Sequence, residues 1–287
     1  MIILLISKIM ISIVMSIFNK EDVLERVIRS LIDTSSVLVT EYIFVLDGCT
    51  DGSEQIVRHM VKKIPAYARY KILNTYNVFE TRSNNVGMKN ATKKYVCIVQ
   101  DDMQILENNW DRRMLEPFRR FDDIFAVTAK TTEQMTSDGQ YIYGIEGPVG
   151  HNCFTKEFNL SRDIFYVNQL VNRGPLMMDL EKVKILGYFD ETLSGVQACD
   201  DHDMCIKAYT NHGWKCGCYW IQYYSPLEWG SSRSGANSQY LKEQIQINID
   251  EMCKRYKTFL ECWDHDGLYE ERFLKDVNPN GCVTKLP

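Results

Sequence analysis

Residues 95–103 read YVCIVQDDM, an apolar run that ends in two neighbouring carboxylates. The stretch from Tyr95 to Val99 is typical of a strand that is buried on both faces. Asp101 and Asp102 repel one another unless a positive group joins them. At the end of a buried strand a divalent cation with oxygen ligands can supply that charge, so Asp102 is a candidate metal ligand. A turn with solvated acidic side chains is the alternative interpretation.

The segments before this strand repeat one pattern of a strand followed by a helix. Residues 9–17 are rich in Ile and Val, residues 42–46 form a second apolar run that ends at Asp47, and a third strand is expected at about 69–73. Apolar strands that alternate with amphipathic helices predict a parallel sheet with helices on each side. Ligands of such sheets bind beyond the carboxyl ends of the strands, so Asp47 and the acidic pair are expected at the same edge.

The helices between these strands are predicted from apolar residues at helical spacing. The first is expected to follow Asn19, a candidate N-cap with Asp22 three residues later. Asp51 or Ser53 is expected to cap the second helix, and a third helix is expected at about 84–93.

After residue 103 the pattern is less regular. We expect, in order, a strand at 124–128, a hairpin with its turn at Asp138-Gly139, a strand, turn, strand and short helix within 166–193, a helix from 200, a strand within 215–224 and a long helix at 238–260. We see no internal repeat or linker. The chain is therefore expected to form one domain, 1–287, with a nucleotide half at about 9–102, an acceptor half at about 103–235 and a helical segment at about 236–287.

A second acidic cluster lies at residues 200–203, which read DDHD. Three carboxylates and an imidazole in four positions are compatible with a metal site, a general base or an acidic helix start, where the helix dipole favours negative charge. A carboxylate whose pKa is raised by its neighbours would suit a general base. The cluster alone does not separate these interpretations.

Composition limits the class of protein. The 287 residues carry a net charge of −5, which argues against binding of nucleic acid through a general basic surface. The ten cysteines are irregularly spaced, and the close pair Cys216 and Cys218 lacks the partners of a zinc site. We expect reduced thiols and a cytoplasmic location.

The first eighteen residues are strongly apolar. A membrane span needs about 20 such residues, and Lys8 interrupts this stretch after seven. We interpret residues 9–17 as a core strand that follows a short apolar leader. Peripheral membrane association through residues 1–18 is the alternative.

Taken together, the motifs resemble those of the family 2 glycosyltransferases, which have the GT-A fold. In chain order they are FNKE at 18–21, DGCTDGS at 47–53, NNVGMKN at 84–90, QDDM at 100–103, GYFDETL at 187–193 and DDHDMCIKAY at 200–209. The resemblance runs from about Lys8 to about Ser232. It implies an α/β fold with a Rossmann-like, mostly parallel central sheet flanked by helices, and a smaller mixed or antiparallel sheet on the acceptor side.

The resemblance also implies which residues surround the nucleotide-sugar donor. The backbone around Ile17 and Asn19, and the carboxylate of Asp47, match positions that hold the nucleotide base. Asn85 matches the family's Asn-x-Gly segment. Arg82, just before it, is a candidate contact of the diphosphate, and a solvated surface arginine is the alternative.

The family's metal motif, Asp-x-Asp, reads Gln100-Asp101-Asp102 here. The neutral amide of Gln100 can still hydrogen-bond a ribose or a metal-bound water. The last Asp of the motif, which usually touches the metal, is retained as Asp102. A later family His that can bind the metal or the diphosphate is Glu228 here. The implied cofactor is Mn²⁺ or Mg²⁺, with Asp102 as the main protein ligand.

The family's catalytic base lies in a Glu-Asp-x-Asp pattern at a helix start, which residues 200–203 match with Asp in place of Glu. The base aligns with Asp201, and Asp200 is the fallback. Four of the five tryptophans are candidates for stacking on a sugar ring, and a place in the core or at the rim is the alternative for each. They are Trp110, Trp214, Trp220 and Trp229.

The implied function is metal-assisted, inverting transfer of a sugar from a nucleotide-diphosphate sugar, with a UDP-sugar expected, to a hydroxyl of a glycan or of a lipid- or protein-linked sugar. A nucleic-acid partner is not expected. The replacements at Gln100 and Glu228 keep open a non-catalytic relative that binds nucleotide sugars or glycans. A sugar nucleotidyltransferase is a weaker alternative, because residues 12–22 contain no Gly and only Lys20 as a basic residue.

Overall fold

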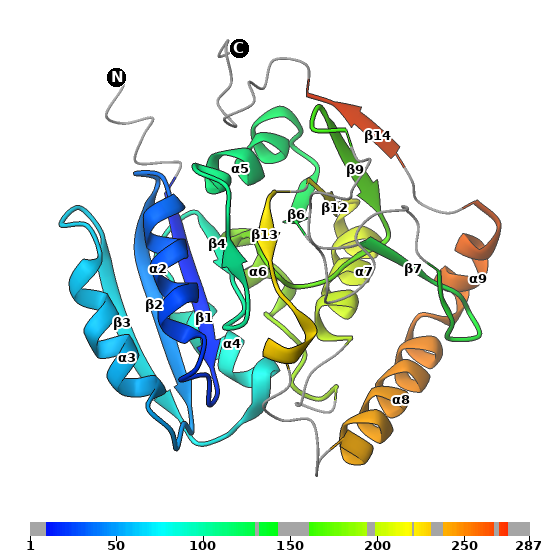
Figure 1. Cartoon of the computed structure of the whole chain (residues 1–287). Helices are drawn as coiled ribbons and strands as arrows, with labels where there is room; N and C mark the ends of the chain where they lie inside the picture. Colours follow the sequence, from blue (N-terminus) through cyan, green and yellow to red (C-terminus); the bar gives the residue numbers. More distant parts are fainter. Residues whose placement is uncertain are drawn as a thin grey trace.

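The computed structural model describes residues 10–129, 132–142, 161–193, 199–219, 221–230, 238–266 and 270–274. Its central feature is a nine-stranded sheet with helices on both faces, accompanied by two small sheets (Figure 1). Most strands of the large sheet run in one direction. This architecture confirms the predicted α/β fold.

Four parallel strands form the first part of the sheet. They are β1 (Ile11–Ile17), β2 (Val39–Asp47), β3 (Arg69–Thr75) and β4 (Tyr95–Ile98), in the spatial order β3-β2-β1-β4. Ile13 lies opposite Tyr42 of β2 and Cys97 of β4, so β1 is paired along both edges. Buried strands of this kind are what the apolar runs predict.

An antiparallel strand joins this part of the sheet to the second part. It is β11 (Leu176–Asp179), which pairs with β4 on one side and with β6 (Ile124–Thr128) on the other. Beyond β6 come β12 (Lys215–Cys218), β9 (Ile164–Asn168) and β14 (Glu270–Phe273). The small sheets consist of β10 (Leu170–Val171), β7 (Thr132–Met135) and β8 (Tyr141–Ile142), and of β13 (Tyr223–Tyr224) and β5 (Gln104–Ile105).

The alternation of side chains along β1 shows which helices cover each face. Ile13 belongs to the apolar cluster of α2 (Leu24–Thr34), α3 (Ser53–Met60) and α5 (Trp110–Arg120). Val14, the next residue, packs in the cluster of α4 (Phe79–Asn90), α6 (Leu180–Leu186), α7 (Asp200–His212), α8 (Ser238–Arg255) and α9 (Lys257–Asp266). Two short 3₁₀ helices are η1 (Val61–Lys63) and η3 (Leu227–Trp229).

Two of the expected N-caps are wrong. The N-cap of α2 is Val23, which makes no side-chain cap, while the Asn19 amide bonds to Thr50. The N-cap of α3 is Gly52, not Asp51 or Ser53. In both places the polar side chains connect loops that are distant in sequence.

Two helix bounds also differ from expectation. Helix α4 begins at Phe79 rather than near residue 84, because Asp47 accepts hydrogen bonds from the backbone at its start. The expected long C-terminal helix is divided at Tyr256 into α8 and α9. The Tyr256 hydroxyl donates to Asp203 of α7 at 2.6 Å, so the division coincides with a contact to another helix.

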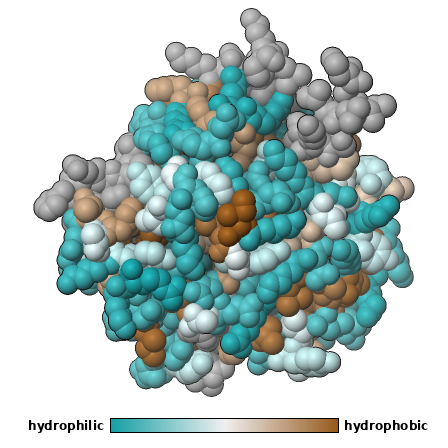
Figure 2. Space-filling model, turned by 180° about the vertical axis from the view of Figure 1, so that it is seen from behind, coloured by the Kyte–Doolittle hydropathy of each residue, from teal (hydrophilic) through white to brown (hydrophobic). Residues whose placement is uncertain are grey.

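The surface seen from behind is mostly hydrophilic, with separate apolar areas rather than one continuous apolar face (Figure 2). Within the described residues, no helix combines the length and apolar character that a membrane span requires. Residues 1–9, in the apolar leader, lie outside the described part of the chain.

Candidate functional site

The candidate site lies at the edge of the sheet where β1, β2, β3 and β4 end. The backbone N–H of Phe18, directly after β1, donates to Asp101 Oδ2, after β4, at 3.0 Å. Helices α4 and α7 begin at this edge, and their first turns are linked through Arg173, whose side chain lies near Glu80 and Asp200. The acidic motifs of the sequence are therefore brought to one side of the fold.

Asp47 is buried at the end of β2 and holds the start of α4. Its Oδ1 accepts from Thr75 Oγ1 at 2.7 Å and from the backbone N–H of Val78 at 2.8 Å. Its Oδ2 accepts from the backbone N–H of Phe79 at 3.0 Å. Gly48 has φ +72°, and a Cβ there would lie 2.8 Å from the nitrogen of Asn77, so this close turn requires glycine. Asp47 thus shapes the connection between β3 and α4.

The loops after β1 and β2 are joined by side chains. Asn19 accepts from the backbone N–H of Thr50 at 2.8 Å, and Cys49 Sγ donates to the Ile17 carbonyl at 3.3 Å. Asp51 accepts from the backbone N–H of Glu21 at 3.0 Å. These contacts fix the backbone around Ile17 and Asn19, where the sequence predicts contact with the nucleotide base.

The two neighbouring carboxylates after β4 are in different surroundings. Burial raises the pKa of Asp101 to about 7, although Lys20 lowers it. Lys20 Nζ lies 4.0 Å from Asp101 Oδ1 and also donates to the carbonyl of Trp229. Asp102 Oδ1 is buried and has no hydrogen-bond partner among the residues that the structure describes. The positive group that two neighbouring carboxylates require is therefore Lys20, which lies beside Asp101. Asp102 retains an oxygen that makes no hydrogen bond among the described residues.

Gln100 precedes this pair and lies against the segment that leads into β11. A Cβ at Gly174 would be well inside van der Waals contact of Gln100 Oε1. Gly174 has φ +110°, which disfavours any other residue. The backbone at Gly174 therefore passes close to Gln100, which connects the two halves of the site.

The first turn of α7 carries Asp200 and Asp201, both buried. Asp200 Oδ2 accepts from Arg173 Nη1 at 2.7 Å, and Asp201 Oδ2 accepts from the Arg173 backbone N–H at 3.1 Å. Burial raises the pKa of Asp200 despite Arg173. Burial also acts to raise the pKa of Asp201, but Arg173, His202 and two backbone N–H groups outweigh it, so this pKa is lowered. Asp201 is the more accessible of the two, because Asp200 is fully buried.

His202 is buried beside Asp201. Its Nε2 lies 3.1 Å from Asn172 Oδ1, 3.7 Å from Glu133 Oε2 and 3.8 Å from Asp201 Oδ1. Burial lowers the pKa of His202, but Asp201, Cys199 and Glu133 together raise it to about 10. The imidazole is therefore protonated at neutral pH and adds a positive charge next to Asp201.

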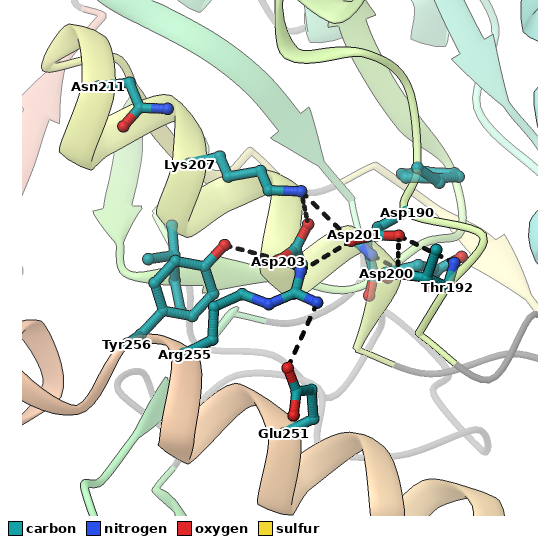
Figure 3. A network of polar contacts seen from close by, with 12 residues as sticks. Asp190, Thr192, Asp200, Asp201, Asp203, Lys207, Asn211, Glu251, Arg255 and Tyr256 are labelled. Carbon is teal, nitrogen blue, oxygen red and sulfur yellow. Dashed lines mark hydrogen bonds and ion pairs between the residues drawn. The ribbon is translucent and has the colours of Figure 1, made fainter.

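Asp203 forms a separate network that attaches α7 to the C-terminal helices (Figure 3). Its Oδ1 accepts from Tyr256 at 2.6 Å and from Arg255 Nη1 at 2.9 Å, and its Oδ2 lies 2.6 Å from Lys207 Nζ. Arg255 also donates to Asp190 at 2.7 Å. Asp203 is thus engaged in contacts between α7 and the C-terminal helices.

Asn85 and Arg82 lie on α4 in different settings. Asn85 is buried, donates to the Phe189 carbonyl at 2.9 Å and accepts from the Phe189 backbone N–H at 3.1 Å. Its amide therefore ties α4 to the GYFDETL segment. Arg82 is half-exposed and lies 3.9 Å from Glu191, so its guanidinium is available at the surface.

Glu228 and the tryptophans lie in varied places. Glu228 is exposed on η3, and neighbouring Trp229 contacts Tyr224 edge-on at 5.1 Å. Trp110 is fully buried, which fits its core interpretation. Trp214 stacks on His212 at 4.1 Å, at the far end of α7 from Asp201. Trp220 lies outside the described residues.

Sequence reasoning missed Arg173, Glu80 and Lys20 as parts of this site. The Arg173 side chain is buried, and its proximity to Glu80 and Asp200 depends on how β11 and α7 pack. A lone Arg before Gly-Pro carries no local signal of that pairing. Lys20 lies within the FNKE motif, and the charge of Asp101 could have suggested a basic partner.

A divalent cation needs several oxygen ligands. Among the described residues, no three His, Cys, Asp or Glu side chains are grouped so that they could hold a metal ion. Asp102 Oδ1, a buried acceptor that has no hydrogen-bond partner within the described part of the chain, nevertheless suits an oxygen-preferring cation. The described residues therefore offer one candidate ligand for a cation rather than a complete metal site.

A family model described as glycosyl transferase family 2 matches residues 12–176, more than half of the chain. A comparison with curated proteins gave no match. The solved structures that resemble this chain include S. aureus TarS, residues 1–349, at 19% identity and a TM-score of 0.51. The match covers 76% of this chain and 60% of the TarS chain.

Two further structures contain UDP-GlcNAc or GDP-Man. TarS 1–349 in complex with UDP-GlcNAc is 19% identical, with a TM-score of 0.54, and the match covers 85% of this chain and 66% of that one. The mannosyltransferase PcManGT from Pyrobaculum calidifontis, in complex with GDP-Man and Mn²⁺, is 13% identical, with a TM-score of 0.59 and coverage of 89% and 70%. At these identities the likeness shows the shared fold.

Proposed function

Because this chain belongs to glycosyl transferase family 2, we propose that it transfers a sugar from a nucleotide-diphosphate sugar to a hydroxyl group with inversion at the anomeric carbon. The proposed donor is a UDP-sugar. The proposed acceptor is a glycan or a lipid- or protein-linked sugar. We also propose that the chain works as one domain, with the donor bound by about residues 9–102 and the acceptor by about 103–235.

The observation that carries this proposal is the state of Asp201. It is a carboxylate at the start of α7 that lies beside Arg173 and a protonated His202, and their positive charges keep it ionised; the raised pKa expected of a general base is found at Asp200 instead. Asp201 takes the proton of the acceptor hydroxyl. The hydroxyl oxygen attacks the anomeric carbon of the donor sugar, and the bond between that carbon and the diphosphate breaks. Asp200 is less suited to this role because it is fully buried, whereas Asp201 is 5% exposed.

The donor is placed by the loops at the ends of β1, β2 and β3. The nucleotide base lies against the backbone around Ile17 and Asn19, beside the loop that Asp47 orders through its contacts with residues 75–79. Arg82 approaches the diphosphate, and Gln100 and Asp101 approach the ribose side. Two-substrate transfer gains much of its rate from positioning of this kind.

Asp102 is the proposed protein ligand of Mn²⁺ or Mg²⁺, since its buried Oδ1 has no partner among the described residues. When bound, this cation would offset the negative charge that develops on the leaving diphosphate.

Donor choice is tested first by thermal shift with UDP-GlcNAc, UDP-glucose and GDP-mannose, each with and without Mn²⁺. We expect one of the UDP-sugars to raise the melting temperature more with Mn²⁺ than without it. Asp102→Asn is expected to lose the Mn²⁺-dependent part of that shift. A shift by GDP-mannose alone would contradict the UDP assignment, and the absence of any shift would contradict nucleotide-sugar binding.

The base is tested with Asp201→Asn, measured as nucleotide release in the presence of acceptor sugars. We expect kcat to fall by about 100- to 10,000-fold, the usual contribution of a general base, with donor binding nearly unchanged. Asp33→Asn, at an exposed position on α2, is the matched control and should retain activity. Near-normal turnover by Asp201→Asn would refute the base assignment. A wild-type chain that binds a donor but releases no nucleotide would favour the non-catalytic alternative.

A further inference from the structure

Arg173 joins acidic groups from two helices at the candidate site. Its Nη1 donates to Asp200 Oδ2 at 2.7 Å, and its Nε lies 3.5 Å from Glu80 Oε1 and 3.7 Å from Asp201 Oδ2. Its backbone N–H donates to the same Asp201 oxygen at 3.1 Å. One residue therefore contacts Asp201 through both its main chain and its side chain.

The cluster around Arg173 contains more carboxylates than cations even when the guanidinium is present. The carboxylates are Glu80 on α4 and Asp200 and Asp201 on α7, and the second cation is His202, which also faces Glu133 of β7. Without Arg173, two adjacent buried carboxylates would face a single imidazolium. Burial favours the neutral form of a carboxyl group, and a neighbouring like charge favours it further.

The orientation of Asp201 depends on the same segment. The Arg173 backbone N–H occupies Oδ2, and the His202 backbone N–H donates to Oδ1 at 3.0 Å. The Arg173 side chain is itself fixed, because its guanidinium carbon lies 5.4 Å from the centre of the Phe189 ring and the residue is only 6% exposed. A carboxylate held at both oxygens has little freedom to turn.

We propose that Arg173 is a positioning residue that keeps Asp201 ionised and in place, and that Glu80 connects this arrangement to α4. This inference rests on the proposed function of Asp201 as the base. Glu80 directly follows Phe79, whose backbone N–H is bonded to Asp47. The contacts around Asp201 are thereby connected to the loop of residues 75–79, beside the proposed binding region of the nucleotide base.

A first experiment needs no substrate and compares melting temperatures of Arg173→Met and wild type between about pH 7.5 and about pH 5.5. In Arg173→Met the pKa values of the buried carboxyl groups rise above their unfolded values, so the folded state binds more protons and gains stability as the pH falls. We expect a melting-temperature deficit that is largest at about pH 7.5 and smaller at about pH 5.5. A loss of packing alone would give a deficit that does not depend on pH.

Two further variants keep the test decisive. Arg173→Lys retains the positive charge, so its deficit should be smaller and less dependent on pH, and it remains informative if Arg173→Met does not fold. Glu80→Gln removes one partner but leaves Arg173 beside Asp200 and Asp201, so its deficit should be nearly constant over this range. A pH-independent deficit in Arg173→Met, or an equally pH-dependent deficit in Arg173→Lys, would overturn the proposal.

A second experiment measures kcat against pH as release of UDP from the UDP-sugar that gives turnover. In Arg173→Met the acidic limb should move up by about 1 to 3 pH units, the effect of removing an opposite charge, while KM for the donor changes little. If Asp201→Asn is inactive and the limb of Arg173→Met does not move, the positioning role fails and the proposed base stands. If Asp201→Asn is active, the base assignment fails and the positioning role fails with it.

Discussion

Replacement of Arg255 by Met tests how firmly the C-terminal helices hold α7. Arg255 is the last residue of α8, and its guanidinium reaches both Asp203 and Asp190 (Figure 3). Asp203 is 1% exposed, so its negative charge depends on partners within the protein. The substitution removes two charge-assisted hydrogen bonds but retains an apolar stem of similar length.

The expected loss follows from what remains around Asp203. Removing one partner of a buried ion pair costs about 3–5 kcal/mol. Here Lys207 and Tyr256 still contact Asp203, and the Arg255 side chain is 27% exposed, so we expect about 2–3 kcal/mol. In a chain of this size that corresponds to a fall of about 3–5 °C in melting temperature.

The loss should depend on pH in a defined direction. Burial acts to raise the pKa of Asp190, but Thr192 and Arg255 outweigh it, so the folded-state pKa is lowered. A carboxylate with a lowered pKa stabilises the fold above its unfolded pKa of about 3.9, and this stabilisation is lost as the pH falls further. The melting-temperature difference between Arg255→Met and wild type should therefore be full at about pH 7 and smaller at about pH 3.

Circular dichroism melting at several pH values measures both effects. Arg29→Met is the matched control, because Arg29 forms an exposed pair with Glu25 on α2 and its loss should cost no more than about 0.5 kcal/mol. The reasoning is refuted if the two variants lose the same stability at about pH 7, or if the Arg255→Met deficit is unchanged at about pH 3.

Two other substitutions test packing near the site. Gly87→Ala should destabilise the fold by about 1–3 kcal/mol, because a Cβ there would overlap Val14 Cγ1 and lie 3.3 Å from Val45 Cγ2. In a urea titration, adding Val14→Ala to the same chain should restore part of this lost stability. An equal loss in the single and double variants would contradict this account. Asn85→Ala leaves the Phe189 backbone N–H and carbonyl without the Asn85 amide as partner, and it should lower the free energy of unfolding by about 1–3 kcal/mol in the same titration. An unchanged urea midpoint would show that these two hydrogen bonds contribute little to stability.

Much of the fold could be predicted because its signals are local. β1, β2 and β4 are continuous apolar runs, and the hairpin of β7 and β8 turns at Asp138-Gly139 as expected. The position of β11 between β4 and β6 is a long-range pairing that no local pattern specifies. β14 was missed because it is a short edge strand whose residues are only partly buried.

The candidate site divides in the same way. Asp102 and Asp201 could be selected from the sequence because acidic residues there follow a buried strand or begin a helix, and their proposed roles await the tests above. Asn19 was misread as a helix cap because an Asn before a helical pattern looks the same whether it caps that helix or bonds to a distant loop through Thr50. Arg173 could not be selected at all, since its burial beside Asp200 arises only from tertiary packing.

The central place of β11 has a mechanical consequence. This strand is hydrogen-bonded on one side to β4, which leads to Asp102, and on the other to β6, while Arg173 and Gly174 lie just before its first residue. The two parts of the sheet could not swing apart about a hinge without breaking at least one of these two ladders. Binding of a donor and an acceptor must therefore be accommodated by movement of the loops and side chains at the ends of the strands, while the sheet beneath them keeps its width.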